Sequence, residues 1–191
     1  MRSIPLPVRS GLLLLMFALL AAAPTRGQTA SAPTDTTHYQ VDAEIDPASG
    51  RFDVTVDVHF VPRRPADTLR FLLHEDLEIQ NLSSAAVEGH TTSPWRMGGR
   101  DSLFTSVVTI PLTRTATPEA PVSLSWTYSG QIPNDHFPPF GGPAVTPHWV
   151  ELPVEAMWIP VHASLGTRFT FDATVRLPEG YDVVSVGTVQ K

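Results

Sequence analysis

The clearest alternation of apolar and polar residues in the chain runs from Arg51 to Val61. Its apolar members are Phe52, Val54, Val56, Val58 and Phe60. Because successive side chains of a β-strand point to opposite faces, this pattern predicts a strand with one buried and one solvated face. Residues 39–45 alternate in the same way, and the intervening Pro-Ala-Ser-Gly at 47–50 favours a turn. The sequence therefore predicts a β-hairpin over residues 38–61 that begins a larger antiparallel sheet.

Further short apolar runs predict the rest of the fold. Strands are expected at 69–73, 77–82, 103–112, 122–128, 169–177 and 181–186. The runs 103–112 and 122–128 are expected to form a second antiparallel pair, and residues 88–100 a loop or loose hairpin tip. With 19 prolines, 12 glycines and little helical periodicity, the chain is typical of an all-β fold. We expect an antiparallel β-sandwich or saddle-shaped sheet with long Pro/Gly-rich loops.

The longest stretch that fits no regular element is 131–147, which is rich in proline, glycine and aromatic residues. Such a loop in a compact domain is a lid, a binding loop or a strip that covers the core. Under the binding interpretation, four aromatic residues would line a sugar or peptide groove: Phe137, Phe140, Trp149 and Trp158. Under the commoner structural interpretation they belong to the core.

The N-terminus has the pattern of a secretory signal peptide. Arg2 and Arg9 precede an apolar run from Gly11 to Ala23, which is shorter than the ~20 residues that cross a bilayer. We therefore predict a signal peptide at 1–27, a flexible linker at 28–37 and a β-domain at 38–191, in an exported protein of the periplasm or the extracellular space. An uncleaved N-terminal anchor is the alternative; after cleavage no stable membrane span is expected.

Composition narrows the function classes. The chain has no cysteine, which excludes disulfides and thiolate metal sites. Its net charge is −6, and loss of the leader's three arginines leaves 10 basic against 19 acidic residues, a net charge of −9. An acidic surface argues against nucleic acid as a partner.

One short motif suggests metal chemistry. His74-Glu75 is the start of a His-Glu-x-x-His zinc motif, but Glu78 occupies the position of the second histidine and no helical pattern surrounds it. We interpret His74 and Glu75 as a solvated strand end and predict neither a metal ligand nor a catalytic residue. The other six histidines are scattered without ligand spacing and are expected on the surface, His59 on the wet face of the hairpin.

Four motifs in order resemble the N-terminal β-domain of the aminopeptidase N family of zinc metallopeptidases. They are the hairpin 39–60, the strand 124–132 with its Tyr-Ser-Gly, the Trp-Ile-Pro at 158–160, and the strand, Pro-Glu-Gly turn and Val-Val-Ser-Val-Gly at 169–187. The resemblance implies a non-catalytic β-domain, in a truncated or remnant form, because both the Gly-x-Met-Glu-Asn loop and the zinc helix belong to the family's next domain. Zinc would then be a cofactor of that missing domain and not of this chain.

The resemblance also implies contacts and partners. The family's β-domain provides a glutamine before the Trp-x-Pro element for the amino terminus of the substrate, whereas residues 145–152 contain none, and His148 or Glu151 would have to replace it. The candidate ligand or partner contacts are Phe137, Phe140, His148, Trp149 and Glu151. The expected partner is a catalytic metallopeptidase domain or the chain itself. The rival hypothesis is an independent periplasmic or surface binding module for peptide or glycan.

Overall fold

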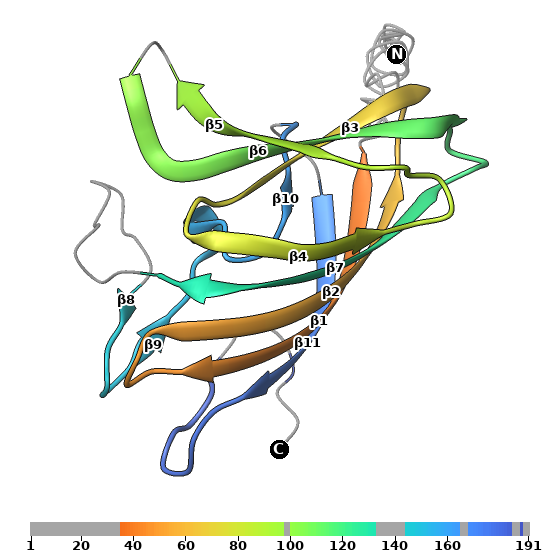
Figure 1. Ribbon diagram of the computed structural model, residues 1–191. Coiled ribbons are helices and arrows are strands. Elements are labelled where there is room, and N and C mark those ends of the chain that lie inside the picture. Colours follow the sequence, from red (N-terminus) through yellow and green to blue (C-terminus); the bar gives the residue numbers. More distant parts are fainter. Residues whose placement is uncertain (1–34, 98–99, 133–143, 165–167, 185–187, 189–191) are drawn as a thin grey trace, which may run out of the picture. The chain divides into compact units, whose positions relative to one another are not determined.

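The computed structural model describes residues 35–97, 100–132, 144–164, 168–184 and 188 (Figure 1). The chain divides into two units, and all described residues belong to the second, which comprises residues 33–191. The predicted signal peptide and most of the predicted linker lie outside the described residues. None of the described helices is long and apolar enough to cross a membrane.

The predicted hairpin is confirmed and forms the middle of a five-stranded sheet. Strands β1 (Thr36–Asp46) and β2 (Arg51–Val61) pair along their whole length, with the turn closed by the Gly50 N–H donating to Asp46 O at 2.8 Å. The first strand begins two residues inside the range predicted as linker. β7 (Val122–Gln131) pairs antiparallel with β2 and with β4 (Leu77–Ser83), and β11 (Arg168–Arg176) pairs parallel with β1. The order is β11-β1-β2-β7-β4.

A four-stranded sheet lies against this one. It has the order β10-β3-β6-β5, from β10 (Val161–His162), β3 (Ala66–His74), β6 (Arg100–Ala116) and β5 (Thr91–Met97). Two short strands, β8 (Ala144–Val145) and β9 (Val150–Glu151), form a separate hairpin, followed by a 3₁₀ turn, η1 (Val154–Ala156). The expected all-β, mostly antiparallel, sandwich-like fold is confirmed.

Three expectations about individual segments were wrong. The runs 103–112 and 122–128 do not pair, because β6 and β7 belong to different sheets. Residues 91–97, expected in a loop or loose hairpin tip, form the strand β5 of a hairpin with β6, and this edge position tolerates Pro94, whose missing N–H would interrupt a central strand. Residues 181–184 are not a strand, and Val184 is almost fully exposed.

The core lies between the two sheets. Aromatic rings of both sheets meet there: Phe71 of β3 packs edge-to-face against Phe60 of β2 at 6.4 Å and against Trp126 of β7 at 5.5 Å. All three side chains are fully buried. Burial of such large apolar surfaces is the main favourable term in the stability of the fold.

The Trp-Ile-Pro motif joins the two sheets. Trp158 O accepts a hydrogen bond from Tyr128 Oη of β7 at 2.9 Å, and Met157 O accepts one from the His74 N–H of β3 at 2.8 Å. Met157 adopts a left-handed conformation, with φ 52°, which is uncommon for a residue other than glycine. Desolvation by burial raises the pKa of Tyr128 well above its ordinary value, so its hydroxyl remains a donor. The motif is therefore a structural clamp.

Candidate functional site

The candidate residues that the structure describes lie on the β8–β9 hairpin. Its turn is fixed by Thr146: the Thr146 N–H donates to Trp149 O at 2.9 Å, and Thr146 Oγ1 accepts the Trp149 N–H at 3.1 Å. Val145, which is fully buried, anchors the hairpin in the core. A short turn held by its own hydrogen bonds presents its outer side chains in a defined arrangement.

Three predicted contacts are exposed on this hairpin. His148 and Glu151 are exposed, and half of the Trp149 surface is accessible. The expectation that Trp149 belongs to the core is therefore wrong. Phe137 and Phe140 lie outside the described residues, so the hairpin accounts for three of the five candidates. An exposed indole beside a carboxylate can contact an apolar side chain and a cationic amine together.

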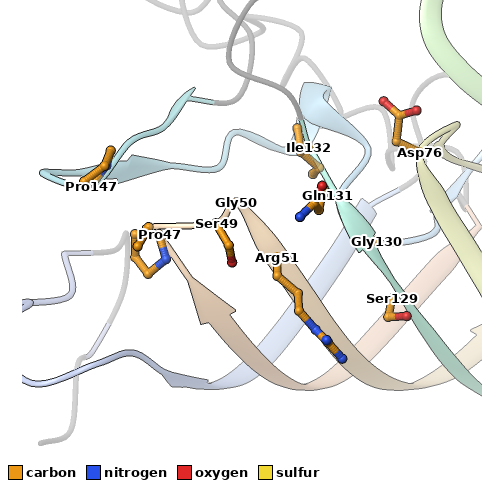
Figure 2. Close-up of a pocket in the computed structure, with 11 residues that line it drawn as sticks. Pro47, Ser49, Gly50, Arg51, Asp76, Ser129, Gly130, Gln131, Ile132 and Pro147 are labelled. Atoms are coloured by element: carbon orange, nitrogen blue, oxygen red, sulfur yellow. The ribbon is translucent and has the colours of Figure 1, made fainter.

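A hollow of about 700 Å³ lies beside the hairpin (Figure 2). Four segments that end at the same edge of the fold line it: residues 47–51 of the β1–β2 turn, Asp76 of the β3–β4 turn, residues 129–132 at the end of β7, and Pro147 of the β8–β9 turn. The sequence indicated the β1–β2 and β3–β4 turns but neither the β8–β9 turn nor the convergence of these segments. The missing information was the pairing of β7 with both β2 and β4, which brings the β1–β2 and β3–β4 turns to the end of β7.

Glycines allow the backbone to close around this hollow. Gly50 has a φ of 72°, and the Ile132 N–H donates to its carbonyl at 3.3 Å. A side chain at Gly130 would place its Cβ 2.0 Å from Asp76 O, so only glycine fits where β7 passes the β3–β4 turn.

Two charged groups at the β1–β2 turn, Arg51 in the hollow and Asp46 behind it, already have partners. Arg51 donates to Asp53 through Nε at 2.6 Å and Nη2 at 2.9 Å, and this hydrogen bond lowers the pKa of Asp53. Asp46, behind the turn, accepts Ser49 Oγ at 2.5 Å and the Ala48 N–H at 3.0 Å, and its pKa is lowered, chiefly by the Ser49 bond. Because the pKa of Asp46 is lowered, its carboxylate is a weak base and does not activate the Ser49 hydroxyl as a nucleophile.

Two of the described histidines, His74 and His162, differ from the sequence expectation. His74 is 4 % exposed, so its interpretation as a solvated strand end was wrong, whereas Glu75 is exposed as expected. His74 Nδ1 accepts the Asp76 N–H at 3.3 Å. His59 lies on the wet face as predicted, with Nδ1 3.2 Å from Ser123 Oγ.

His162, which was expected on the surface, is half-buried instead. Its ring stacks on Phe60 at 4.4 Å, and burial lowers its pKa. Within the described residues, no three histidine, aspartate or glutamate side chains come together in a group that could hold a metal ion.

The fold is similar to that of zinc metallopeptidases. No family model matches the chain, and no curated protein matches it. Among solved structures, it is similar to the M1 zinc metallopeptidase of Deinococcus radiodurans, with a TM-score of 0.58 at 14 % identity. A variant of that enzyme bound to Tyr-Ser-Ala substrate gives 0.56 at 15 %, and a two-domain M1 zinc metallopeptidase variant bound to L-arginine gives 0.54 at 13 %.

The similarity covers one part of those enzymes. In each case it includes 76 % of this chain but 33 % of the peptidase. At such low identity it shows the fold alone: the chain resembles the N-terminal domain of M1 metallopeptidases and spans about a third of their length.

Proposed function

We propose that this chain acts as the exported, non-catalytic β-domain of an M1-type zinc metallopeptidase, and that its β8–β9 hairpin faces the peptide-binding region of a catalytic domain. The observation that carries this proposal is the match of most of the chain to one third of M1 metallopeptidases. The Arg2 and Arg9 leader pattern supports export. Zinc would be held by the catalytic domain, outside this chain.

The hairpin has side chains suited to a peptide's amino terminus. Glu151 is exposed, and its carboxylate can accept charge-assisted hydrogen bonds from an ammonium group. Trp149, two residues earlier, offers an exposed apolar ring for the first side chain of the peptide. Structural neighbours of this chain have been solved with Tyr-Ser-Ala, L-arginine and L-tryptophan, which are ligands with a free amino group.

Reconstitution tests the proposal. The full chain would be mixed with each M1 catalytic domain of its own genome, expressed without a β-domain, and both complex formation and hydrolysis of aminoacyl chromogenic substrates would be measured. We expect no hydrolysis by the chain alone, and a complex with raised activity for one catalytic domain. Zinc-dependent hydrolysis by the chain alone, or no binding to any of these domains, would contradict the proposal.

Two variants connect the assay to the hairpin. Glu151→Gln removes the charge of the proposed ammonium acceptor and should raise KM for substrates with a free amino terminus by at least about tenfold, because a hydrogen bond to a charged group contributes roughly 1.5–3 kcal/mol. Glu78→Gln, which neutralises an exposed glutamate on the edge strand β4, is the matched control and should leave KM unchanged.

An independent binding module remains the second candidate, favoured by the exposed Trp149 next to the polar hollow. It requires the chain alone to bind a short peptide or glycan. Calorimetry with the full chain and Trp149→Ala would show this, with binding lost in the variant. Binding by the chain alone, together with no partner domain, selects this candidate over the first.

A further inference from the structure

The strand β11 has an edge and an apolar face that the described part of the chain leaves uncovered. Its pairing there is with β1 alone. Phe169 and Phe171 are 40 % and 37 % exposed, and their rings lie 6.3 Å apart. Phe169 contacts the core through Tyr39 of β1, at 5.9 Å. A long edge strand with exposed apolar side chains is a template for pairing with another strand.

The backbone of β11 shows which residues could pair. The Arg168 N–H donates to the carbonyl of Asp35, just before β1, at 3.2 Å. Along a strand the N–H and C=O groups point alternately to the two edges, so the even-numbered residues of β11 face β1 and the odd-numbered residues face outward. An added antiparallel strand must therefore pair with Phe169, Phe171, Ala173 and Val175.

A second copy of β11 can pair antiparallel through its own odd-numbered residues. The charged side chains of the two strands then favour one register. With the two-fold axis at Thr170, Arg168 lies opposite Asp172 of the second copy, twice by symmetry, and Phe169 lies opposite Phe171 of the second copy. With the axis at Asp172, Arg168 would face Arg176 of the second copy, and Asp172 would face itself. Like charges directly opposite one another are unfavourable.

One other register also pairs opposite charges. With the axis at Thr174, Asp172 would face Arg176 of the second copy. Arg176 is already held by Asp42 of β1, to which its Nη2 donates at 2.9 Å. That register also places Phe171 opposite Leu177 and so loses the two phenylalanine pairs. Of the two registers that pair opposite charges, the axis at Thr170 is the one that keeps Arg176 with Asp42 and pairs Phe169 with Phe171.

We propose that β11 is a homodimerisation edge, at which two copies of the chain pair antiparallel about Thr170 and join their five-stranded sheets. The pairing places the Phe169 and Phe171 rings of both copies on one face, with two Arg168–Asp172 ion pairs on the other. It uses a different edge from the β8–β9 hairpin. It is therefore independent of the proposed function.

A cysteine cross-link tests the register directly, because the chain contains no cysteine of its own. In this register Thr170 lies opposite itself in a non-hydrogen-bonded pair, where Cα atoms are about 4.5 Å apart, within the range that a disulfide spans. The full-chain variant Thr170→Cys should oxidise to a covalent dimer. Thr174→Cys, also exposed on the same face of β11, does not lie opposite itself in this register and should form no covalent dimer under oxidation.

A charge exchange gives a second test that does not depend on oxidation. Arg168→Asp and Asp172→Arg should each weaken the dimer by roughly tenfold in sedimentation equilibrium, because each places like charges opposite one another at two symmetric positions. The double variant restores opposite charges and should recover the wild-type dissociation constant. Arg176→Asp is the control for the alternative register and should leave dimerisation unchanged.

Each outcome of these experiments either supports or overturns the proposed dimer. Cross-linking at Thr170 with recovery in the double variant supports the proposal. A wild-type chain that stays monomeric at all concentrations overturns it, as does cross-linking of Thr174→Cys at the rate of Thr170→Cys. Loss of the dimer in Arg176→Asp also overturns it, in favour of the axis at Thr174. None of these results changes the reconstitution assay, so failure of one proposal leaves the other intact.

Discussion

Strands β2 and β11 have the same alternation of apolar and polar residues but different surroundings. The five apolar side chains on the inner face of β2 are at most 2 % exposed, whereas Phe169 and Phe171 of β11 are 40 % and 37 % exposed. β2 lies between β1 and β7, and β11 is at the edge of the same sheet. Alternation therefore identifies the apolar face of a strand, while position in the sheet decides whether that face is covered.

The four-stranded sheet covers the apolar face of β2. Phe71 of β3 contacts Phe60 of β2 and Trp126 of β7, so the four-stranded sheet packs over the centre of the five-stranded one. At β11 the inner face has fewer neighbours, although Val175 still packs against the core. The following predictions test this difference between centre and edge, from the largest expected effect to the smallest.

Val56→Asp should cause the largest loss of stability. Val56 is fully buried in β2, and a carboxylate there must be desolvated or protonated. We expect the free energy of unfolding to fall by at least about 3 kcal/mol. The control is Thr55→Asp, on the exposed face of the same strand, which should cost well under about 1 kcal/mol. Equal denaturation midpoints for the two variants would mean that the register of β2 is wrong.

Gly130→Ala tests the close backbone approach at the end of β7. The new Cβ would lie 2.0 Å from Asp76 O, so the β3–β4 turn must move. We expect a loss of about 2 kcal/mol, which is typical of overpacking that shifts backbone. Gly89→Ala, where no atom lies within 4 Å of the added Cβ, is the matched control in chemical denaturation. A stable Gly130→Ala protein would contradict the approach of β7 to this turn.

Tyr128→Phe tests the clamp between the sheets. The change deletes the buried hydroxyl that donates to Trp158 O and leaves that carbonyl without this donor. The expected cost is about 1–2 kcal/mol, measured by thermal unfolding. Tyr181→Phe, whose hydroxyl donates to Pro147 O at the surface, should cost less. An equal effect of both changes would argue against the clamp.

Phe171→Asp introduces a carboxylate on the edge strand β11, as Val56→Asp does on the central strand β2. Because Phe171 is already 37 % exposed, an ionised carboxylate there stays hydrated. The unfolding free energy of the monomer should fall by no more than about 1 kcal/mol. It should be measured at low protein concentration, so that dimerisation does not contribute. A loss as large as that of Val56→Asp would remove the distinction between centre and edge.

The smallest expected effect on stability is that of the Arg176–Asp42 ion pair at the surface. The hydrogen bond from Arg176 lowers the pKa of Asp42 below its ordinary 3.8. A carboxylate with a lowered pKa stabilises the folded state while it is ionised, so its contribution is present above pH 3.8 and disappears as the pH falls through the lower folded value. The stability difference between wild type and Arg176→Gln should therefore shrink on acidification. A difference that grows on acidification would contradict the assigned pair.

Local sequence determined most of the strands and the faces they bury. The hairpin 38–61, the run 122–128 and the exposed His59 could be read from alternation and turn residues, because both signals depend on a few neighbouring positions. The same signals predicted the all-β fold. Because His148 and Glu151 were named as candidate contacts, they were also expected to be exposed. The hairpin that carries them could not be predicted, because its two-residue strands are too short to show an alternating pattern.

Only the tertiary structure decided how the strands are arranged. β6 and β7 are consecutive in sequence and were expected to pair, yet β7 inserts between β2 and β4 while β6 joins β3 and β5. The same arrangement buried His74, exposed Phe171 and brought Gly130 against Asp76. Each of these depends on residues far apart in the chain, and the alternation within one strand carries no information about which strand will lie beside it or above it.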